Sequence, residues 1–241
     1  MKILSLLTIL LLLPSLCFGA ASTSFDGTND EVDMSTVLDV TTGNVSGCFW
    51  ANLTENAVGD VISGKKNDGA AGSAGYQIKQ RSDDFGNILI SDGVDQFESA
   101  GTTDIDGAWH HVCGTYNATT QTTVLYTDGV QEDTDTSANV GSLTNAVEYA
   151  VGESGSELGD ATGLVAHVSQ HSAVLTVVEV NELMWKPESI PTSRGGFWPL
   201  FDTGGNTTIE NDLSGNNFDG TVSGATDSTS GPPVMFAMGA Q

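Results

Sequence analysis

The residues of this sequence with the clearest capacity for chemistry are its acids, because 31 of the 241 residues are Asp or Glu. Hydrolysis of a glycosidic bond requires two carboxylates at a set separation. Glu31 and Asp33 are the nearest candidates, but no third acid follows where the pattern needs one. A second group lies in a loop rich in Gly and Ser, which cannot by itself fix carboxylate geometry. Its members are Glu153, Glu157 and Asp160. We therefore predict that the chain is not an enzyme.

The histidines do not suggest a metal or nucleophile site. His110 and His111 are neighbours on a predicted strand, so they point to opposite faces. His167 and His171 share a strand face but lie far apart along it. No Cys or His pair has zinc spacing, and the sequence has no nucleophile elbow, dinucleotide loop or phosphate loop. Structural or surface roles are the expectation for all four histidines.

The elements that would position these side chains are β-strands. Short runs rich in Val, Ile, Thr and aromatic residues alternate with Gly, Asp, Asn and Ser, which is typical of an all-β sandwich or barrel. The clearest hairpin turns at Asp128-Gly129, where both residue types tolerate positive φ. The predicted strands are 45–53, 60–64, 75–79, 87–91, 109–116, 123–127, 146–152, 164–171 and 197–201.

One short helix is predicted after Thr176. Thr176 and Glu179 have the spacing of a capping box. The apolar stripe that follows consists of Val180, Leu183 and Met184, which indicates one buried helix face.

The first 20 residues have the pattern of a signal peptide. Lys2 precedes an apolar run over 3–13, and small residues follow at 19–21. The run is shorter than the ~20 residues that span a bilayer, so we expect secretion and no membrane insertion of the mature chain. One domain is expected over 21–226. Ser, Gly and Pro around 228–233 predict a loose tail over 227–241.

The net charge of −24 restricts the partners. A chain without a basic surface cannot neutralise phosphates, so nucleic acid is excluded, and anionic lipid is disfavoured. A partner should be cationic, such as calcium, or neutral, such as a sugar or another protein. In an oxidising compartment Cys48 and Cys113 could form a disulfide, although two buried thiols would fit the apolar strands equally well.

Four stretches in order resemble the laminin-G-like family of the concanavalin A-like lectin/glucanase superfamily. They are Ser24–Asp33, Gly47–Ala51, Trp109–Tyr116 with the hairpin at 126–130, and Gly163–Val168 running on to the predicted helix. The resemblance covers about residues 24–186. It implies a two-sheet antiparallel jelly roll with one short helix, often a calcium site, and often glycan or protein ligands.

The resemblance also suggests ligands for calcium. Asp26 and Asp30 stand in the stretch that resembles the acidic loop of the family, and calcium accepts carboxylates and carbonyls from irregular loops. Asp104 and Asp106 are second candidates. The alternative for Asp26 is a turn with Gly27.

The C-terminal part departs from the family order. Residues 197–226 resemble the opening strands of such domains, but here they come last, as in a circular permutation. They could complete their own sandwich, be donated to a neighbouring subunit, or be a remnant of a second repeat. The side chains available for such assembly are Phe197, Trp198, Leu200, Phe201, Phe218 and Val222.

Two functions fit these observations. The first is a non-catalytic structural subunit of an extracellular or cell-surface assembly, with the chain itself as partner. The second is a secreted, calcium-dependent, lectin-like module, for which Trp185 and Trp198 could be exposed sugar-binding aromatics and Trp50 and Trp109 core residues. The chain also carries glycosylation sequons at Asn44, Asn52, Asn117 and Asn206.

Overall fold

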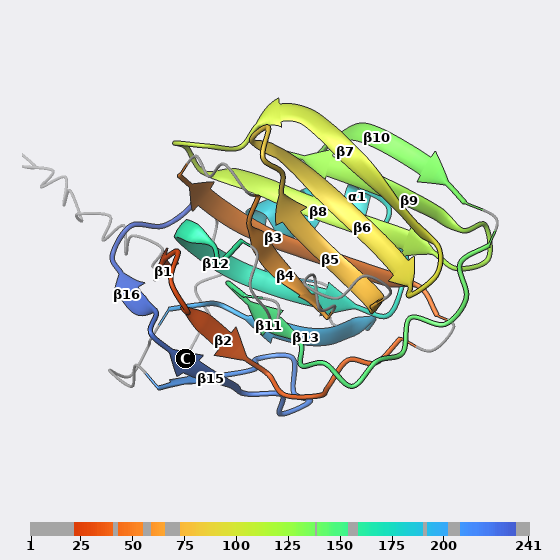
Figure 1. The fold of residues 1–241 in the computed structure, drawn as a ribbon. Helices are drawn as coiled ribbons and strands as arrows, with labels where there is room; N and C mark the ends of the chain where they lie inside the picture. The colour runs from red at the N-terminus through yellow and green to blue at the C-terminus, as the bar shows by residue number, and fades with distance from the viewer. Residues whose placement is uncertain are drawn as a thin grey trace, which may run out of the picture.

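The computed structural model describes residues 22–40, 43–54, 59–65, 73–137, 139–153, 159–189, 192–201 and 208–234. The predicted signal peptide, Glu157, Asn206 and the last residues of the predicted tail lie outside this part. The described chain forms two antiparallel sheets of eight strands each, packed face to face, with one short helix (Figure 1). The predicted two-sheet, all-β fold is therefore confirmed.

Sheet A has the order β10-β9-β8-β3-β12-β1-β16, and β13 also pairs with β12. Its strands are β1 (Ser22–Asp26), β3 (Val45–Leu53), β8 (His110–Asn117), β9 (Thr122–Thr127), β10 (Val130–Thr136), β12 (Thr162–His171), β13 (Arg194–Trp198) and β16 (Thr226–Ser228). The β9–β10 hairpin turns at Asp128-Gly129, and both residues have positive φ, as predicted.

Sheet B has the order β14-β15-β2-β11-β4-β5-β6-β7. Its strands are β2 (Glu31–Asp33), β4 (Val61–Lys65), β5 (Ala74–Gln80), β6 (Phe85–Asp92), β7 (Gln96–Asp104), β11 (Ala150–Val151), β14 (Ile209–Glu210) and β15 (Gly220–Ser223). Two predicted strands differ from the structure. The one at 146–152 shortens to β11. The one at 197–201 ends at Trp198, because Pro199 has no N–H to pair and Leu200 has positive φ.

The main core lies between the inner faces of the two sheets. Phe49 and Val112 of sheet A meet Ile78, Ile88 and other apolar residues of sheet B. The sheets approach closely at Gly114, where a Cβ atom would lie 2.7 Å from the Ile88 side chain. The inward side chains of the two sheets thus form one continuous apolar layer.

Helix α1 (Val177–Trp185) covers the outer face of sheet A, behind it in Figure 1. Its predicted capping box is present, because Thr176 and Glu179 bond each other's backbone amides. Val180 and Leu183 pack over Cys48 and Cys113, which form a disulfide between directly paired positions of β3 and β8. The sequence left open whether these cysteines form a disulfide or stay as two thiols, and the structure contains the disulfide.

The C-terminal strands β13–β16 complete the sandwich of their own chain, and we call this segment the C-terminal closure. β13 pairs with β12, β15 with β2, and β16 with β1. Trp198 is fully buried and stacks on Tyr149 with ring centroids 5.3 Å apart. The six side chains predicted for assembly thus lie in or against this chain's core, except that Phe197 and Phe201 pack around His167.

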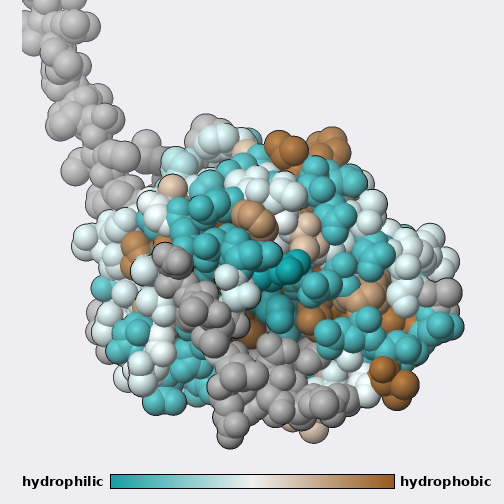
Figure 2. Space-filling model, turned by 45° about the horizontal axis from the view of Figure 1, so that its top comes forward, coloured by the Kyte–Doolittle hydropathy of each residue, from teal (hydrophilic) through white to brown (hydrophobic). Residues whose placement is uncertain are grey.

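Hydrophilic residues predominate on the face shown in Figure 2, and hydrophobic residues stand in small separate groups. Among the described residues, no helix has the length and apolar character needed to cross a membrane.

Candidate functional site

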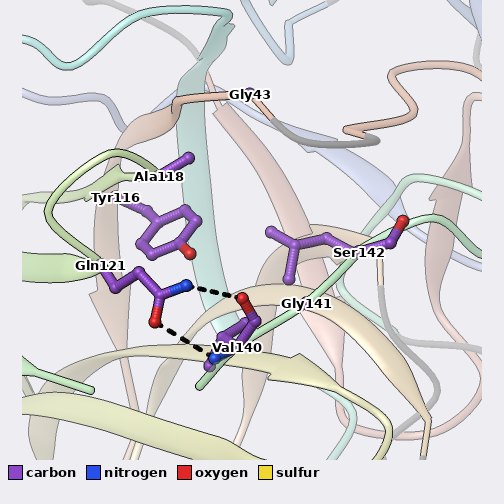
Figure 3. A pocket seen from close by; sticks show the side chains of 8 residues that line it. Gly43, Tyr116, Ala118, Gln121, Val140, Gly141 and Ser142 are labelled. Atoms are coloured by element: carbon purple, nitrogen blue, oxygen red, sulfur yellow. Dashed lines mark hydrogen bonds between the residues drawn. The ribbon is translucent and has the colours of Figure 1, made fainter. Parts of the chain in front are cut away.

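A hollow of about 270 Å³ opens at one end of the sandwich (Figure 3). We call it the Tyr116 hollow. Three chain segments enclose it: the segment just before β3, the end of β8 with the β8–β9 turn, and the loop after β10. Its lining consists of Gly43, Tyr116, Ala118, Gln121, Val140, Gly141, Ser142 and Leu143. The sequence did not reveal this site, because its parts come together only through the fold.

Tyr116 provides the polar group of the hollow. Its ring is 2% exposed and packs edge-on against Phe97 on the facing sheet, with centroids 6.1 Å apart. Its hydroxyl points into the space between the side chains that line the hollow (Figure 3), and no described residue forms a hydrogen bond with it. Burial raises the pKa of this hydroxyl, and the nearby Asp92 carboxylate raises it further. Tyr116 is therefore a neutral donor and acceptor at neutral pH.

Hydrogen bonds within the lining, and from residues just outside it, fix the walls of the hollow. The Gln121 amide donates to the Val140 carbonyl at 2.8 Å and accepts from the Val140 N–H at 3.2 Å (Figure 3). Asp92 accepts from the Gly141 N–H at 2.7 Å, and Asn44 accepts from the Ala118 N–H at 3.0 Å. The walls thus have a defined shape before any ligand arrives.

A second hollow, of about 300 Å³, lies on the C-terminal closure. Its lining is Pro199, Phe201, Glu210, Asn211, Asp212, Leu213, Asn217 and Asp219. The three carboxylates already hold backbone amides: Glu210 accepts from Leu200 at 2.8 Å, Asp212 from Phe197 at 3.0 Å, and Asp219 from Asp212 at 2.9 Å. They stabilise the loop that encloses this hollow.

The predicted calcium ligands lie in an acidic corner, which we define as Asp26, Asp30, Glu31, Glu153 and Asp160. Asp30 accepts from the Asp26 N–H at 2.6 Å, and Asp160 accepts from the Asn29 N–H at 2.9 Å. Burial raises the pKa of Asp30 against the effect of the Asp26 amide, and the Asp26 and Asp160 carboxylates add to the increase. Burial and neighbouring acids also raise the pKa of Glu31 and Glu153.

The acidic corner fits a calcium ion in the chemistry of its donors. It offers oxygen ligands only, and within the described chain none of its acids forms an ion pair. The structure does not gather three of these carboxylates around one point. Among described residues, only Cys48, His111 and Cys113 bring three such ligand atoms together, and these sulfurs are joined in the disulfide.

The second pair of predicted calcium ligands instead holds a turn. Asp104 accepts from the Asp106 N–H at 2.9 Å, and Asp106 accepts from the Gln80 side chain. The predicted acid group at 153–160 contributes Glu153 and Asp160 to the acidic corner, and Glu31 belongs there too. Nothing in this arrangement isolates two carboxylates as an acid and base pair.

The histidines are structural, as the strand pattern indicated. His110 bonds Asp128 at 2.8 Å on the surface. His111, His167 and His171 are buried, and burial lowers the pKa of each to about 3. They are neutral at physiological pH.

The aromatic prediction was half wrong. Trp185 is 42% exposed on α1, but Trp198 is buried and its Nε1 donates to the Phe218 carbonyl at 2.8 Å. Trp50 is buried as expected, and Trp109 is partly buried against it. The apolar neighbours of Trp198 come from distant segments, so its local sequence did not reveal its burial.

Two sequons adjoin the Tyr116 hollow. Asn44 follows Gly43, and Asn117 precedes Ala118, so both stand next to lining residues. Asn52 is partly buried near the end of β3.

The fold and the site define a two-sheet jelly roll with ligand-sized hollows at its ends. A sequence profile of the laminin G-like family, of the concanavalin A-like lectin/glucanases superfamily, matches residues 26–181. The chain belongs to this family. The match ends before the C-terminal closure, so the predicted permutation stays a prediction. A search of curated proteins finds no match.

Several solved structures share the fold. A candidate carbohydrate-binding protein from Bacteroides ovatus is 17% identical over 90% of this chain, which spans 61% of that protein, with a TM-score of 0.69. A heptameric pentraxin resembling serum amyloid P, from Limulus polyphemus, is 14% identical over 69% of this chain and 82% of its own, with a TM-score of 0.55. The carbohydrate-binding module of a Ruminococcus gnavus sialidase, bound to α2,3-sialyllactose, is 12% identical over 67% of this chain and 97% of its own, with a TM-score of 0.52.

Proposed function

We propose that the chain is a secreted, non-catalytic carbohydrate-binding module. The observation that carries the proposal is that the fold presents hollows of about 270 and 300 Å³ in which every lining carboxylate already holds a backbone amide. Sites for drug-sized ligands occupy roughly 300–1,000 Å³, so these hollows suit something close to one sugar ring. Glycoside hydrolysis needs a carboxyl that exchanges protons with the substrate, which such engaged side chains do not supply.

The comparisons and the sequence support this function. Proteins from Bacteroides ovatus and Ruminococcus gnavus with the same fold are described as binding carbohydrate, the second with sialyllactose in place. The signal peptide predicted at 1–20 would bring the chain to an extracellular or cell-surface location, where glycans are exposed.

Calcium binding at the acidic corner forms part of the proposal. Burial raises the pKa of Asp30, Glu31 and Glu153, and repulsion by neighbouring carboxylates adds to the increase; the ion would offset that repulsion. A ligand that binds only the folded state stabilises it, so millimolar calcium should raise the melting temperature by several degrees. Sodium at matched ionic strength should raise it far less. Equal shifts in the two salts would show screening alone.

The test of carbohydrate binding is a glycan array probed with the mature protein. We expect retention of at least one glycan family, without release of reducing sugar after prolonged incubation. Failure to bind any glycan, or turnover of a bound one, would contradict the proposal.

A second candidate is the structural subunit of an extracellular assembly. It is favoured by the C-terminal closure, whose Trp198 and Leu200 are fully buried in the core although they come late in the chain. The same contacts made between chains would join subunits head to tail. Native mass and electron micrographs of the mature protein decide this. A monomer at high concentration rules assembly out, whereas loss of polymers after removal of the chain beyond Arg194 supports it.

A further inference from the structure

We infer that the Tyr116 hollow binds one neutral sugar residue, with the Tyr116 hydroxyl as its principal hydrogen-bonding group. The inference rests on the proposed function and names the site and the ligand class.

The first argument is the state of the Tyr116 hydroxyl. Packing holds the Tyr116 ring in place, with 2% of the residue exposed, while its hydroxyl oxygen is not fully buried and forms no hydrogen bond with a described residue. A hydroxyl that is fixed in position and has no protein partner can bond a ligand without first breaking another bond. The other polar side chains nearby are engaged, since Gln121 bonds Val140 and the Ser142 hydroxyl donates to Thr144 at 3.0 Å. Among the lining side chains, the Tyr116 hydroxyl is thus the polar group without a described protein partner, and it both donates and accepts.

The second argument is the shape and character of the walls. Val140 and Leu143 are 5% and 3% exposed, and with Ala118 they give the hollow apolar sides (Figure 3). A sugar ring presents hydroxyls at its edge and C–H groups on its faces. In a space of about 270 Å³ one such ring can place a hydroxyl on Tyr116 and its C–H face against Leu143.

The third argument is charge. None of the lining side chains carries a charge, so an acidic sugar would bury its carboxylate without a partner. Asp92 lies close enough to raise the pKa of the Tyr116 hydroxyl, and it would repel the same carboxylate. The chain as a whole carries −24, which also opposes the approach of an anion. The structure therefore points to neutral sugars, unlike the sialyllactose that is bound by the module from Ruminococcus gnavus.

The experiment uses the mature protein made in bacteria, so that the sequons at Asn44 and Asn117 beside the hollow carry no glycan. An array of neutral glycans together with their sialylated and sulfated counterparts identifies the best ligand, and calorimetry measures its affinity. Tyr116→Phe removes the hydroxyl alone, and Ala118→Phe fills the hollow. Tyr126→Phe is the matched control, because Tyr126 is similarly buried but lies beneath α1.

We expect neutral glycans to bind and their acidic counterparts to bind at least ten-fold more weakly. Tyr116→Phe should weaken binding ten-fold or more, Ala118→Phe should abolish it, and Tyr126→Phe should leave it unchanged. Preference for acidic glycans, or full affinity in Tyr116→Phe with an unchanged melting temperature, overturns the inference and leaves the proposed function standing. If Ala118→Phe fails to fold, the glycan affinity of Tyr116→Phe alone tests the inference. Absence of any glycan binding overturns both.

Discussion

The two open sides of the sandwich are closed by opposite means. On one side, β10 of sheet A meets the edge of β7 in sheet B through charged side chains, and we call this the β7–β10 closure. Glu132 accepts from the Thr102 N–H at 2.9 Å, and Asp133 accepts from the Ala100 N–H at 3.0 Å. On the other side, the C-terminal closure inserts the fully buried Trp198 and adds paired strands.

The two closures therefore differ in what a mutation would disrupt. At the β7–β10 closure, carboxylates occupy backbone amides of an edge strand that would otherwise be free to pair with another chain. At the C-terminal closure, apolar burial supplies the free energy, so removal of one side chain exposes the core. The first side is protected against wrong partners, whereas the second determines whether the domain is folded.

The largest expected effect is the loss of folding stability at low pH, because three histidines are buried. Burial lowers the pKa of His111, His167 and His171 to about 3 in the fold, below the ordinary value of 6.5. The unfolded chain therefore binds more protons as the pH falls below 6.5, and stability decreases with it. At pH 5 each histidine should cost about 2 kcal/mol. The raised pKa values of the acidic corner act in the opposite direction.

Acid should also loosen one side first. His167 packs between Phe197 and Phe201, and His171 bonds Ser193, so both lie against the C-terminal closure. Hydrogen exchange at pH 7 and pH 5 should show protection lost in β12 and β13 before β7 and β10. Uniform loss across both sides would contradict the assigned pKa values.

The next effect is that of Trp198→Ala. Trp198 is fully buried, stacks on Tyr149 and donates to the Phe218 carbonyl. Replacement of a core tryptophan by alanine typically costs ~3–5 kcal/mol, so the midpoint of urea denaturation should fall sharply. Trp185→Ala, on the exposed face of α1, is the control and should cost far less. Similar midpoints for the two variants would place Trp198 outside the core.

A smaller effect is expected from Glu132→Ala in the β7–β10 closure. The Glu132 carboxylate bonds the amides of Thr102 and Thr103 and the Thr103 hydroxyl. Its loss should cost about 2 kcal/mol and leave the edge of β7 open. Light scattering should then show concentration-dependent association that the wild type lacks. Glu182→Ala, exposed on α1, removes the same charge without opening an edge, so equal association in that variant would implicate charge alone.

The smallest effect concerns His110 and Asp128, at the turn that begins β10. The hydrogen bond to Asp128 raises the pKa of His110, although burial opposes the shift. Its contribution to stability is therefore full below pH 6.5 and is lost as pH rises through the folded pKa. An exposed pair of this kind is worth less than ~1 kcal/mol. An NMR titration should show the His110 pKa fall in Asp128→Asn, and an unchanged value would exclude the pair.

The sequence predicted the features that depend on neighbouring residues. The Asp128-Gly129 turn and the capping box of Thr176 and Glu179 follow from local backbone chemistry, and the structure contains both. The Tyr116 hollow could not be predicted in this way, because Gly43 and Val140 reach Tyr116 only after the sheets have paired. The sequence left Trp198 open between the closing strands and an exposed sugar site, because the residues that cover it come from distant segments. Local sequence patterns determine turns and helix caps, whereas cavities and the two closures depend on how distant strands pair.

The pairing of β1 with β16 has a mechanical consequence. Ser22 lies opposite Ser228, and its hydroxyl donates to the Ser230 carbonyl at 2.7 Å, so the start of β1 and the end of β16 lie side by side. Tension applied through these ends would peel β1 from β16 one hydrogen bond at a time. Peeling needs less force than shearing, in which all the bonds of a strand pair break together. The domain is therefore suited to display at the end of an attachment, and poorly suited to bear tension within a row of linked domains.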